Sequence, residues 1–154
     1  MARLACVDLP ALPLQLLSRR HPDWLDFPMA VAAEESPQAR LLWVNERARQ
    51  LRILPGIRYT TALSLSGELR AGTVRSDEIT NAVRQVTDRL RDFSPEVEPS
   101  VEEPGVFWLD GEGLNRLFRS AAAWGRAIRD GLRDLGFSAH VVVGFTRYGT
   151  YAVA

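Results

Sequence analysis

The sequence predicts an α+β fold, in which a sheet carries helices on one face and a small subdomain is inserted near its start. Short apolar runs typical of buried strands alternate along the chain with longer stretches whose apolar residues recur at helical spacing. Their order is β-α, then β-β-α-α-β, then α-β-β-α-β. When the middle group is set aside, the remaining elements make one sheet covered by helices.

Each strand is predicted from a short apolar or β-capable run bounded by polar or turn residues. The expected strands are 3–8, 28–33, 40–44, 69–74, 96–103, 106–110 and 141–145. The second and third strands are spaced as a hairpin. The dipeptide Pro104-Gly105 is a strong turn signal, so the fifth and sixth strands should form another.

The helices are predicted from apolar periodicity and from signals at their ends. The expected helices are 10–20, 45–51, 59–65, 76–93 and 114–135. Pro10 is tolerated in a first turn, and Asn45 can cap the helix that follows it. The last helix should bury a face that includes Leu117 and Trp124, and Gly136 should stop it.

Composition limits the class of protein. The 154 residues suit one domain, or one domain with a small insertion, and 46% are hydrophobic, enough for a core. No apolar run reaches the roughly 18 residues of a membrane-spanning helix, and the amino-terminal run is too short for a secretory signal. We therefore expect a cytoplasmic protein that has no membrane partner. The single Cys6 excludes an internal disulfide.

The charges balance, with 19 basic residues, all of them arginine, and 19 acidic residues. Strong sequence-independent DNA binding usually shows a basic excess, because the phosphate backbone must be neutralised. Any contact between this chain and DNA is therefore expected to be weak or indirect.

Several motifs, taken in order, resemble those of the Y-family DNA polymerases. The family's first strand ends in a metal-binding Asp, its fingers begin with a Pro-x-Ala-Val strand, and its central hairpin ends in a Phe-Leu-Asp motif. The matching segments are Ala5-Cys6-Val7-Asp8, Pro28-Met29-Ala30-Val31, Leu54-Pro55-Gly56-Ile57, Phe107-Trp108-Leu109-Asp110 and Val143-Gly144-Phe145-Thr146. The match is specific because it runs in order over nearly the whole chain.

This resemblance implies a polymerase palm-like sheet of the ferredoxin-like βαββαβ type. Residues 1–25 and 70–154 would form the palm-like domain, and residues 26–69 would form a fingers-like insertion. The apolar ending at 150–154 has no cap, so the palm is expected to be truncated at its C-terminus. A truncated palm should not synthesise DNA alone, since the family's enzymes also need a thumb and a little-finger domain.

The resemblance also implies a cage of carboxylates for two Mg²⁺ ions, built from the Asp of the first strand and an Asp-Glu pair at the hairpin turn. Asp8 is present. Counting back from the hairpin motif places the pair on Gly105 and Val106, which carry no carboxylate. Glu102 and Glu103 could imitate the pair only in a longer hairpin, whose turn would be displaced from Asp8.

Other nucleotide-handling positions depart from the family too. Pro10 stands at the second acidic position, and Pro13 stands where a bulky gate against ribonucleotides is expected. The fingers pair of Tyr and Arg is replaced by Glu46 and Arg49, and Glu46 would repel a triphosphate. After the last strand, Tyr148-Gly149 replaces an Asn-Lys pair.

No residue is assigned a catalytic role, and the remaining candidates each have two interpretations. Asp8 is a vestigial metal ligand or the cap of the following helix. Glu102 and Glu103 are metal ligands or solvated turn carboxylates. Arg49 binds phosphate or pairs with Glu46 at i,i+3 on an exposed helix face.

Within the Y family, a retained scaffold with missing site chemistry resembles the ImuB-like proteins. This resemblance implies a non-catalytic adaptor in DNA damage-induced mutagenesis, which assembles an error-prone replicative-type polymerase, the sliding clamp and RecA or a RecA-like protein. No cofactor is then expected. The alternative is an active translesion polymerase that uses Asp8, Glu102 and Glu103 with Mg²⁺. An unrelated α+β interaction domain is a third interpretation, and it predicts a sheet order unlike a polymerase palm.

Overall fold

The computed structural model describes residues 3–113 and 117–144. The chain folds as two compact units. The first, here called the terminal unit, combines Met1–Pro10 with Thr80–Ala154, and the second, the inserted unit, is Ala11–Ile79. The expected insertion at 26–69 lies inside the inserted unit, which also includes the helix after the first strand.

The terminal unit contains a four-stranded sheet with the order β5-β6-β1-β7. Its strands are β1 (Leu4–Asp8), β5 (Val97–Pro99), β6 (Val106–Asp110) and β7 (His140–Gly144). Its helices are α5 (Ala121–Asp134) and the part of α4 (Ser76–Leu90) that begins at Thr80. Every neighbouring pair of strands is antiparallel. Without the inserted unit, the chain order is βαββαβ, which confirms the expected fold class.

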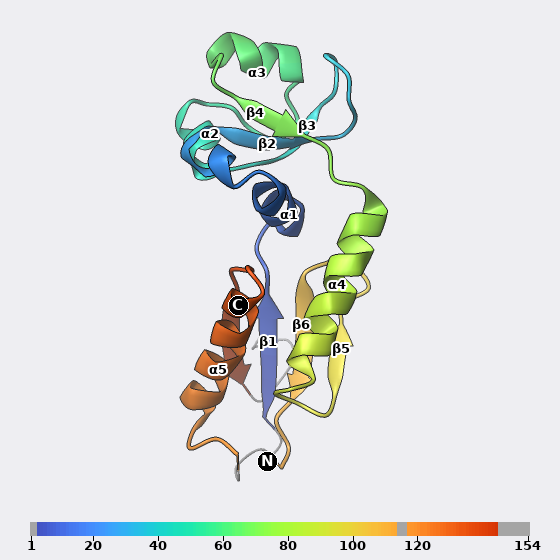
Figure 1. Cartoon of the computed structure of the whole chain (residues 1–154), viewed down its shortest axis with the longest axis vertical. Helices are drawn as coiled ribbons and strands as arrows, with labels where there is room; N and C mark the ends of the chain where they lie inside the picture. The colour runs from blue at the N-terminus through green and yellow to red at the C-terminus, as the bar shows by residue number, and fades with distance from the viewer. Residues whose placement is uncertain (1–2, 114–116, 145–154) are drawn as a thin grey trace. The chain divides into compact units, whose positions relative to one another are not determined.

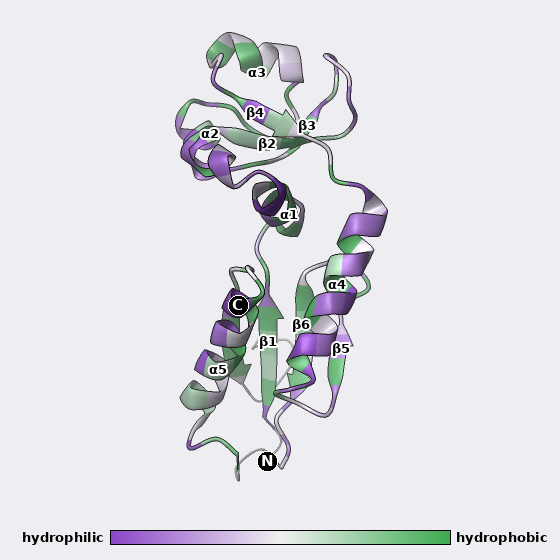
Figure 2. Ribbon diagram, viewed as in Figure 1, coloured by the Kyte–Doolittle hydropathy of each residue, from purple (hydrophilic) through white to green (hydrophobic). Residues whose placement is uncertain are grey.

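The strand register assigns each side chain to one face of this sheet, because cross-strand partners point to the same side. Ala5 and Val7 pair with Leu109 and Phe107 on β6, and all four side chains are fully buried. We call this side the helix face, since Figure 1 shows α4 and α5 on one side of the sheet. The apolar character of β1 and β6 is visible in Figure 2.

The opposite side, here called the Asp8 face, carries the alternate residues of the same strands. Asp8 pairs with Val106 on β6 and His140 on β7. Cys6 pairs with Trp108 and Val142 and is buried between these neighbouring strands.

Helix α5 starts later than the sequence predicted. The expected helix 114–135 begins in the structure at Ala121, because the Ser120 hydroxyl accepts a hydrogen bond from the Ala123 amide at 3.1 Å and caps the helix there. Leu117 precedes the helix and is 73% exposed, so the expectation that it belongs to the buried face was wrong. Leu114 lies outside the described residues.

The inserted unit contains a three-stranded sheet with the order β3-β2-β4. Its strands are β2 (Met29–Ala32), β3 (Leu41–Val44) and β4 (Arg70–Gly72); its helices are α1 (Leu12–Arg20), η1 (Pro22–Asp26), α2 (Glu46–Gln50) and α3 (Tyr59–Leu65). Strands β2 and β3 form the predicted antiparallel hairpin, and β4 pairs with β2 in parallel.

Asn45 fixes the junction between this hairpin and α2. Its side-chain oxygen accepts hydrogen bonds from the amides of Ala48 at 2.9 Å and Met29 at 3.0 Å, and its amide group donates to the Phe27 carbonyl. The predicted helix cap is therefore confirmed, and the same side chain also ties the start of β2 to the end of β3.

Two apolar clusters hold the inserted unit together. The larger includes Ala30, Leu41 and Ile53, and the smaller packs Leu17 of α1 against Met29 and Val31 of β2. This second cluster explains why α1 belongs to the inserted unit. Gly72 lies against this cluster: a Cβ at this position would lie 2.8 Å from a Leu17 methyl carbon, so the Leu17 side chain would have to shift.

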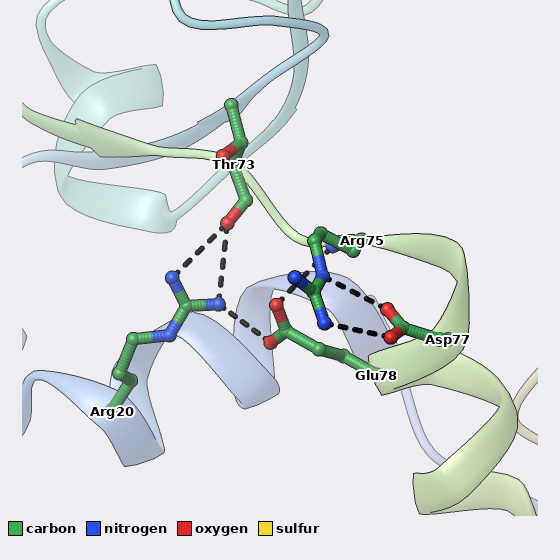
Figure 3. Close-up of polar contacts among 5 residues, drawn as sticks. All are labelled: Arg20, Thr73, Arg75, Asp77 and Glu78. Carbon is green, nitrogen blue, oxygen red and sulfur yellow. Dashed lines mark hydrogen bonds and ion pairs between the residues drawn. The ribbon is translucent and has the colours of Figure 1, made fainter.

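A polar network holds the first turn of α4 within the inserted unit (Figure 3). The Arg20 guanidinium donates to the Thr73 carbonyl at 3.2 Å and to the Glu78 carboxylate at 2.6 Å. Glu78 in turn accepts from the Arg75 amide at 3.4 Å, which is the backward half of a capping box. Arg75 pairs with Asp77 through two hydrogen bonds.

In the part of the chain that the structure describes, no helix is both long enough and apolar enough to cross a membrane.

Candidate metal and nucleotide site

Asp8 lies at the carboxyl end of β1, partly buried on the Asp8 face. Its cross-strand partners there are Val106 on one side and His140 on the other. The carboxylate thus has an apolar neighbour on β6, where a palm-type metal site needs a second acid, and an imidazole on β7.

The hairpin turn fixes what stands next to Asp8. The Leu9 amide donates to the Gly105 carbonyl at 2.8 Å, so the turn is joined to the chain directly after Asp8. Gly105 has a positive φ of 105°, a conformation that favours glycine. Gly105 and Val106, the pair found by counting along the sequence, are therefore the residues beside Asp8, and neither carries a carboxylate.

Glu102 and Glu103 lie in the same turn and are both exposed. The Glu103 amide donates to the Ser100 hydroxyl at 3.1 Å, and the Glu103 carbonyl accepts from the Val106 amide at 3.1 Å. The negative charge of Glu103 raises the pKa of Asp8. Of the two glutamates, Glu103 is therefore the one whose charge affects the pKa of Asp8.

Burial raises the pKa of Asp8, His140 opposes that rise, and the negative charge of Glu103 adds to it. Burial also raises the pKa of the Cys6 thiol, to about 11, with smaller contributions from Asp8 and Glu103. Cys6 is therefore protonated and unreactive near neutral pH. The Asp8 face at this end of the sheet combines two carboxylates and one imidazole that interact through their charges.

Within residues 3–113 and 117–144, no three His, Cys, Asp or Glu side chains are grouped as a metal site would require. A two-ion site needs several carboxylate oxygens converging on the metals. The position on β6 opposite Asp8 offers only the Val106 side chain.

Arg49 lies exposed on α2, in the inserted unit, whereas Asp8 belongs to the terminal unit. Glu46 is exposed on the same helix, but the ion pairs formed among the described residues do not include one between Glu46 and Arg49. The expected i,i+3 pair is therefore not formed. Phe145, Thr146 and Tyr148-Gly149 lie outside the described residues.

His140 is a site residue that the sequence analysis does not identify, because no motif in the sequence marks it. The antiparallel pairing of β7 with β1 places the first residue of β7 against the last residue of β1. That position follows from cross-strand register, which is a long-range property. The available sequence signal was its place at the start of the last apolar strand.

The sheet order and the lone acid at the end of the first strand define a palm-like domain of the Y-family polymerase type. Residues 7–149 match the IMS (impB/mucB/samB) family, and the chain belongs to this family. No curated protein matches the chain in sequence.

Solved structures of Y-family polymerases share the fold. DinB from Sulfolobus solfataricus matches with a TM-score of 0.78 and 16% identity, over 94% of this chain and 42% of that chain. The insertion ternary complex of Dbh DNA polymerase matches with a TM-score of 0.75 and 16% identity, over 92% and 42% of the two chains. At this identity the likeness shows the fold alone. The chain spans less than half the length of these polymerases.

Proposed function

We propose that this chain is the polymerase-shaped part of a non-catalytic adaptor in DNA damage-induced mutagenesis and translesion synthesis. The observation that carries the proposal is the register of β6 against β1, which puts Val106 opposite Asp8. A palm that lacks an acid at this position keeps the scaffold of a polymerase without the ligands of its two-ion chemistry.

The geometry of Mg²⁺ supports this interpretation. The ion demands near-octahedral coordination with ligand distances of about 2.0–2.1 Å, so a displaced carboxylate cannot substitute for a well-placed one. Asp8 fits the role of one ligand. Gly105 and Val106 do not fit the others, and Glu103 belongs to an exposed part of the turn. We therefore assign no cofactor to the protein.

The charge of the Asp8 face agrees with weak or indirect contact with DNA. Asp8, Glu98 and Asp110 are placed on this face by the strand register. The chain as a whole has a formal net charge of zero. Neither feature favours binding to a phosphate backbone, because binding of this kind depends on excess positive charge.

The adaptor would act by bringing partners together in the bacterial cytoplasm. The ImuB-like resemblance supports three partners: an error-prone replicative-type polymerase, the sliding clamp, and RecA or a RecA-like protein. A pull-down of the full-length protein against these three, repeated with the 154-residue chain, tests whether the polymerase-like part carries any of the docking surfaces.

Primer extension by the full-length protein with Mg²⁺ tests the absence of catalysis. We expect no template-dependent extension, and we expect Asp8→Ala to leave that result unchanged. An active Y-family polymerase in the same buffer is the positive control. Extension that disappears in the Asp8→Ala variant would overturn the proposal.

One observation favours a second function, an active translesion polymerase. The charge of Glu103 raises the pKa of Asp8, so the two carboxylates are close enough to interact. A shared Mg²⁺ would relieve their repulsion. If this function holds, Glu103→Gln and Asp8→Ala should each abolish extension, while Glu98→Gln on the same face should not.

A further inference from the structure

The two edge strands of the terminal sheet differ in how well they are protected. Natural sheets protect exposed edges with short strands, prolines and charges, because unpaired backbone groups invite another strand. Strand β5 follows this rule, since it contains only Val97, Glu98 and Pro99. Strand β7 does not: its five residues read His-Val-Val-Val-Gly, without proline or an acidic or arginine side chain.

Among residues 3–113 and 117–144, a groove runs along this edge. It has a volume of about 560 Å³ and is formed by α5 and residues 139–143. The side of α5 that lines it carries the small residues Ala121, Ala122 and Gly125. Val141, Val142 and Val143 are each only partly buried, although the central strand β1 buries its equivalent residues completely.

The groove is also positively charged. Arg126 and Arg129 line it from successive turns of α5, and His140 lines it from β7. Arg126 is exposed, and its guanidinium forms no hydrogen bond or ion pair within residues 3–113 and 117–144. Arg129 makes a long contact of 3.9 Å with Asp130, which also pairs with Arg133 at 3.6 Å. The capped amino terminus of α5 adds partial positive charge at one end.

We propose that this groove binds an extended, acidic segment of a partner protein, which adds a strand to the sheet at β7. The partner's backbone would pair with β7, as in other cases of strand addition. Its carboxylates would reach Arg126 and Arg129, and the small residues of α5 leave space for its side chains. The groove shares His140 with the surroundings of Asp8, but the proposal assigns no role to the Asp8 carboxylate, so it holds whether or not the protein is catalytic.

The same features disfavour two other occupants. A second copy of the chain paired edge to edge through β7 would bring its own Arg126 and Arg129 against the first pair, and like charges repel. A nucleic acid would meet the three valines of β7, which offer nothing to phosphates, in a 154-residue chain whose formal net charge is zero.

A peptide titration tests the proposal. The probe is N-acetyl-Glu-Val-Glu-Val-Glu-Val-Glu-amide, added to the ¹⁵N-labelled chain while amide shifts are followed by NMR. We expect shifts concentrated on β7 and the amino-terminal half of α5. The double variant Arg126→Ala/Arg129→Ala should weaken binding about tenfold, the effect of losing two partly solvated charge pairs. The control Arg47→Ala/Arg84→Ala, which removes two other exposed arginines and the same charge, should bind as the wild type does.

Modified probes separate strand addition from simple charge attraction. In a strand, the amides of alternate residues point to opposite sides, so only one of the two sets in the peptide can face β7. N-methylation of the set that faces β7 should abolish binding, and N-methylation of the other set should not. The proposal is overturned if a peptide in which every glutamate is replaced by lysine binds as well as the acidic peptide. It is overturned too if both methylated peptides bind as well as the unmethylated peptide. It is also overturned if the parent peptide leaves β7 unperturbed. Preferential shifts of β7 by oligo-dT, or concentration-dependent self-association through β7, would likewise overturn it.

Discussion

Asp8 has a histidine on one side and a valine on the other, and this asymmetry determines its chemistry. Val106 and the surrounding sheet remove water from the carboxylate without offering a hydrogen-bond donor in return. His140 offsets part of that cost. The net result is a carboxyl group whose pKa is above its ordinary value of 3.8, with Glu103 contributing to the rise. The ionised form of Asp8 is therefore destabilised by folding.

This shift predicts the pH dependence of stability. Because the folded pKa of Asp8 is raised, its favourable contribution is fully present below the unfolded pKa and is lost as pH rises through the folded value. Asp8→Asn removes that loss while keeping the side-chain size. We expect the variant to have a higher urea midpoint than the wild type near pH 7, with the gain shrinking towards pH 3.

Asp110→Asn is the matched control, since it removes a negative charge from the same face but at the far end of the paired strands. Comparison of the two variants distinguishes the general effect of removing a negative charge from this face from the specific effect of removing the buried charge of Asp8. An Asp8→Asn gain that is the same at both pH values would contradict the assignment.

At the scale of single elements, α5 contains two glycines in contrasting surroundings. A Cβ at Gly131 would lie 2.6 Å from the Phe93 ring, whereas a Cβ at Gly125 would meet Val141 and Val143 at ordinary contact distances of 3.7 and 3.8 Å. Both positions are interior to the helix, where alanine is intrinsically better than glycine by about 1 kcal/mol. The packing therefore decides the sign of each substitution.

We expect Gly125→Ala to raise the free energy of unfolding by up to about 1 kcal/mol. Gly131→Ala should lower it, because overpacking costs about 1–3 kcal/mol and exceeds the gain in helix propensity. Urea denaturation of both variants measures the difference. If both substitutions stabilise the protein, the close packing of Phe93 on Gly131 is incorrect.

Elements were predictable from sequence where the signal was local. The hairpin of β2 and β3 follows from two apolar runs, and the Asn45 cap follows from one residue type in one position. The start of α5 was not predicted correctly, because the apolar spacing through Leu117 outweighed the capping signal of Ser120. Apolar periodicity does not distinguish a buried residue from one that is 73% exposed in the folded chain.

The site was predictable only in part, for a related reason. Counting back along β6 gave Gly105 and Val106, which the structure places beside Asp8, because positions along one strand follow directly from the sequence. The position of His140 depends on the pairing of β7 with β1, which joins the two ends of the terminal unit. No local sequence signal specifies that pairing. The packing of Leu17 against Met29 and Val31 could not be predicted for the same reason, because it also joins separate elements.

At the scale of the whole molecule, the inserted unit is one continuous stretch of chain with its own apolar clusters. Leu17, Met29 and Val31 form one of them, and the Arg20–Glu78 ion pair also lies inside the unit. The terminal unit is discontinuous, because its first strand precedes the insertion and the rest follows it. The two units should therefore differ in their ability to fold alone.

We expect the excised segment 11–79 to fold independently, with dispersed amide resonances and a cooperative urea transition. Leu17→Ala in this segment should reduce its stability by about 2–5 kcal/mol and leave it largely unfolded, as the loss of a buried leucine in a small domain implies. The exposed Leu25→Ala is the matched control and should have little effect. Poorly dispersed amide resonances in the wild-type segment would show that its folding depends on the terminal unit.

The left-handed backbone at Gly105 has an evolutionary consequence. Val106 could become an acid by changing its side chain alone, which would put a carboxylate opposite Asp8. Gly105, at a φ of 105°, could accept a carboxylate only with backbone strain of about 1–3 kcal/mol or a rebuilt turn. A lineage that reached this turn cannot return to a paired acidic motif by side-chain substitutions without that penalty. If the proposed function holds, this turn would make a paired acidic motif at 105 and 106 costly to build by side-chain substitution alone.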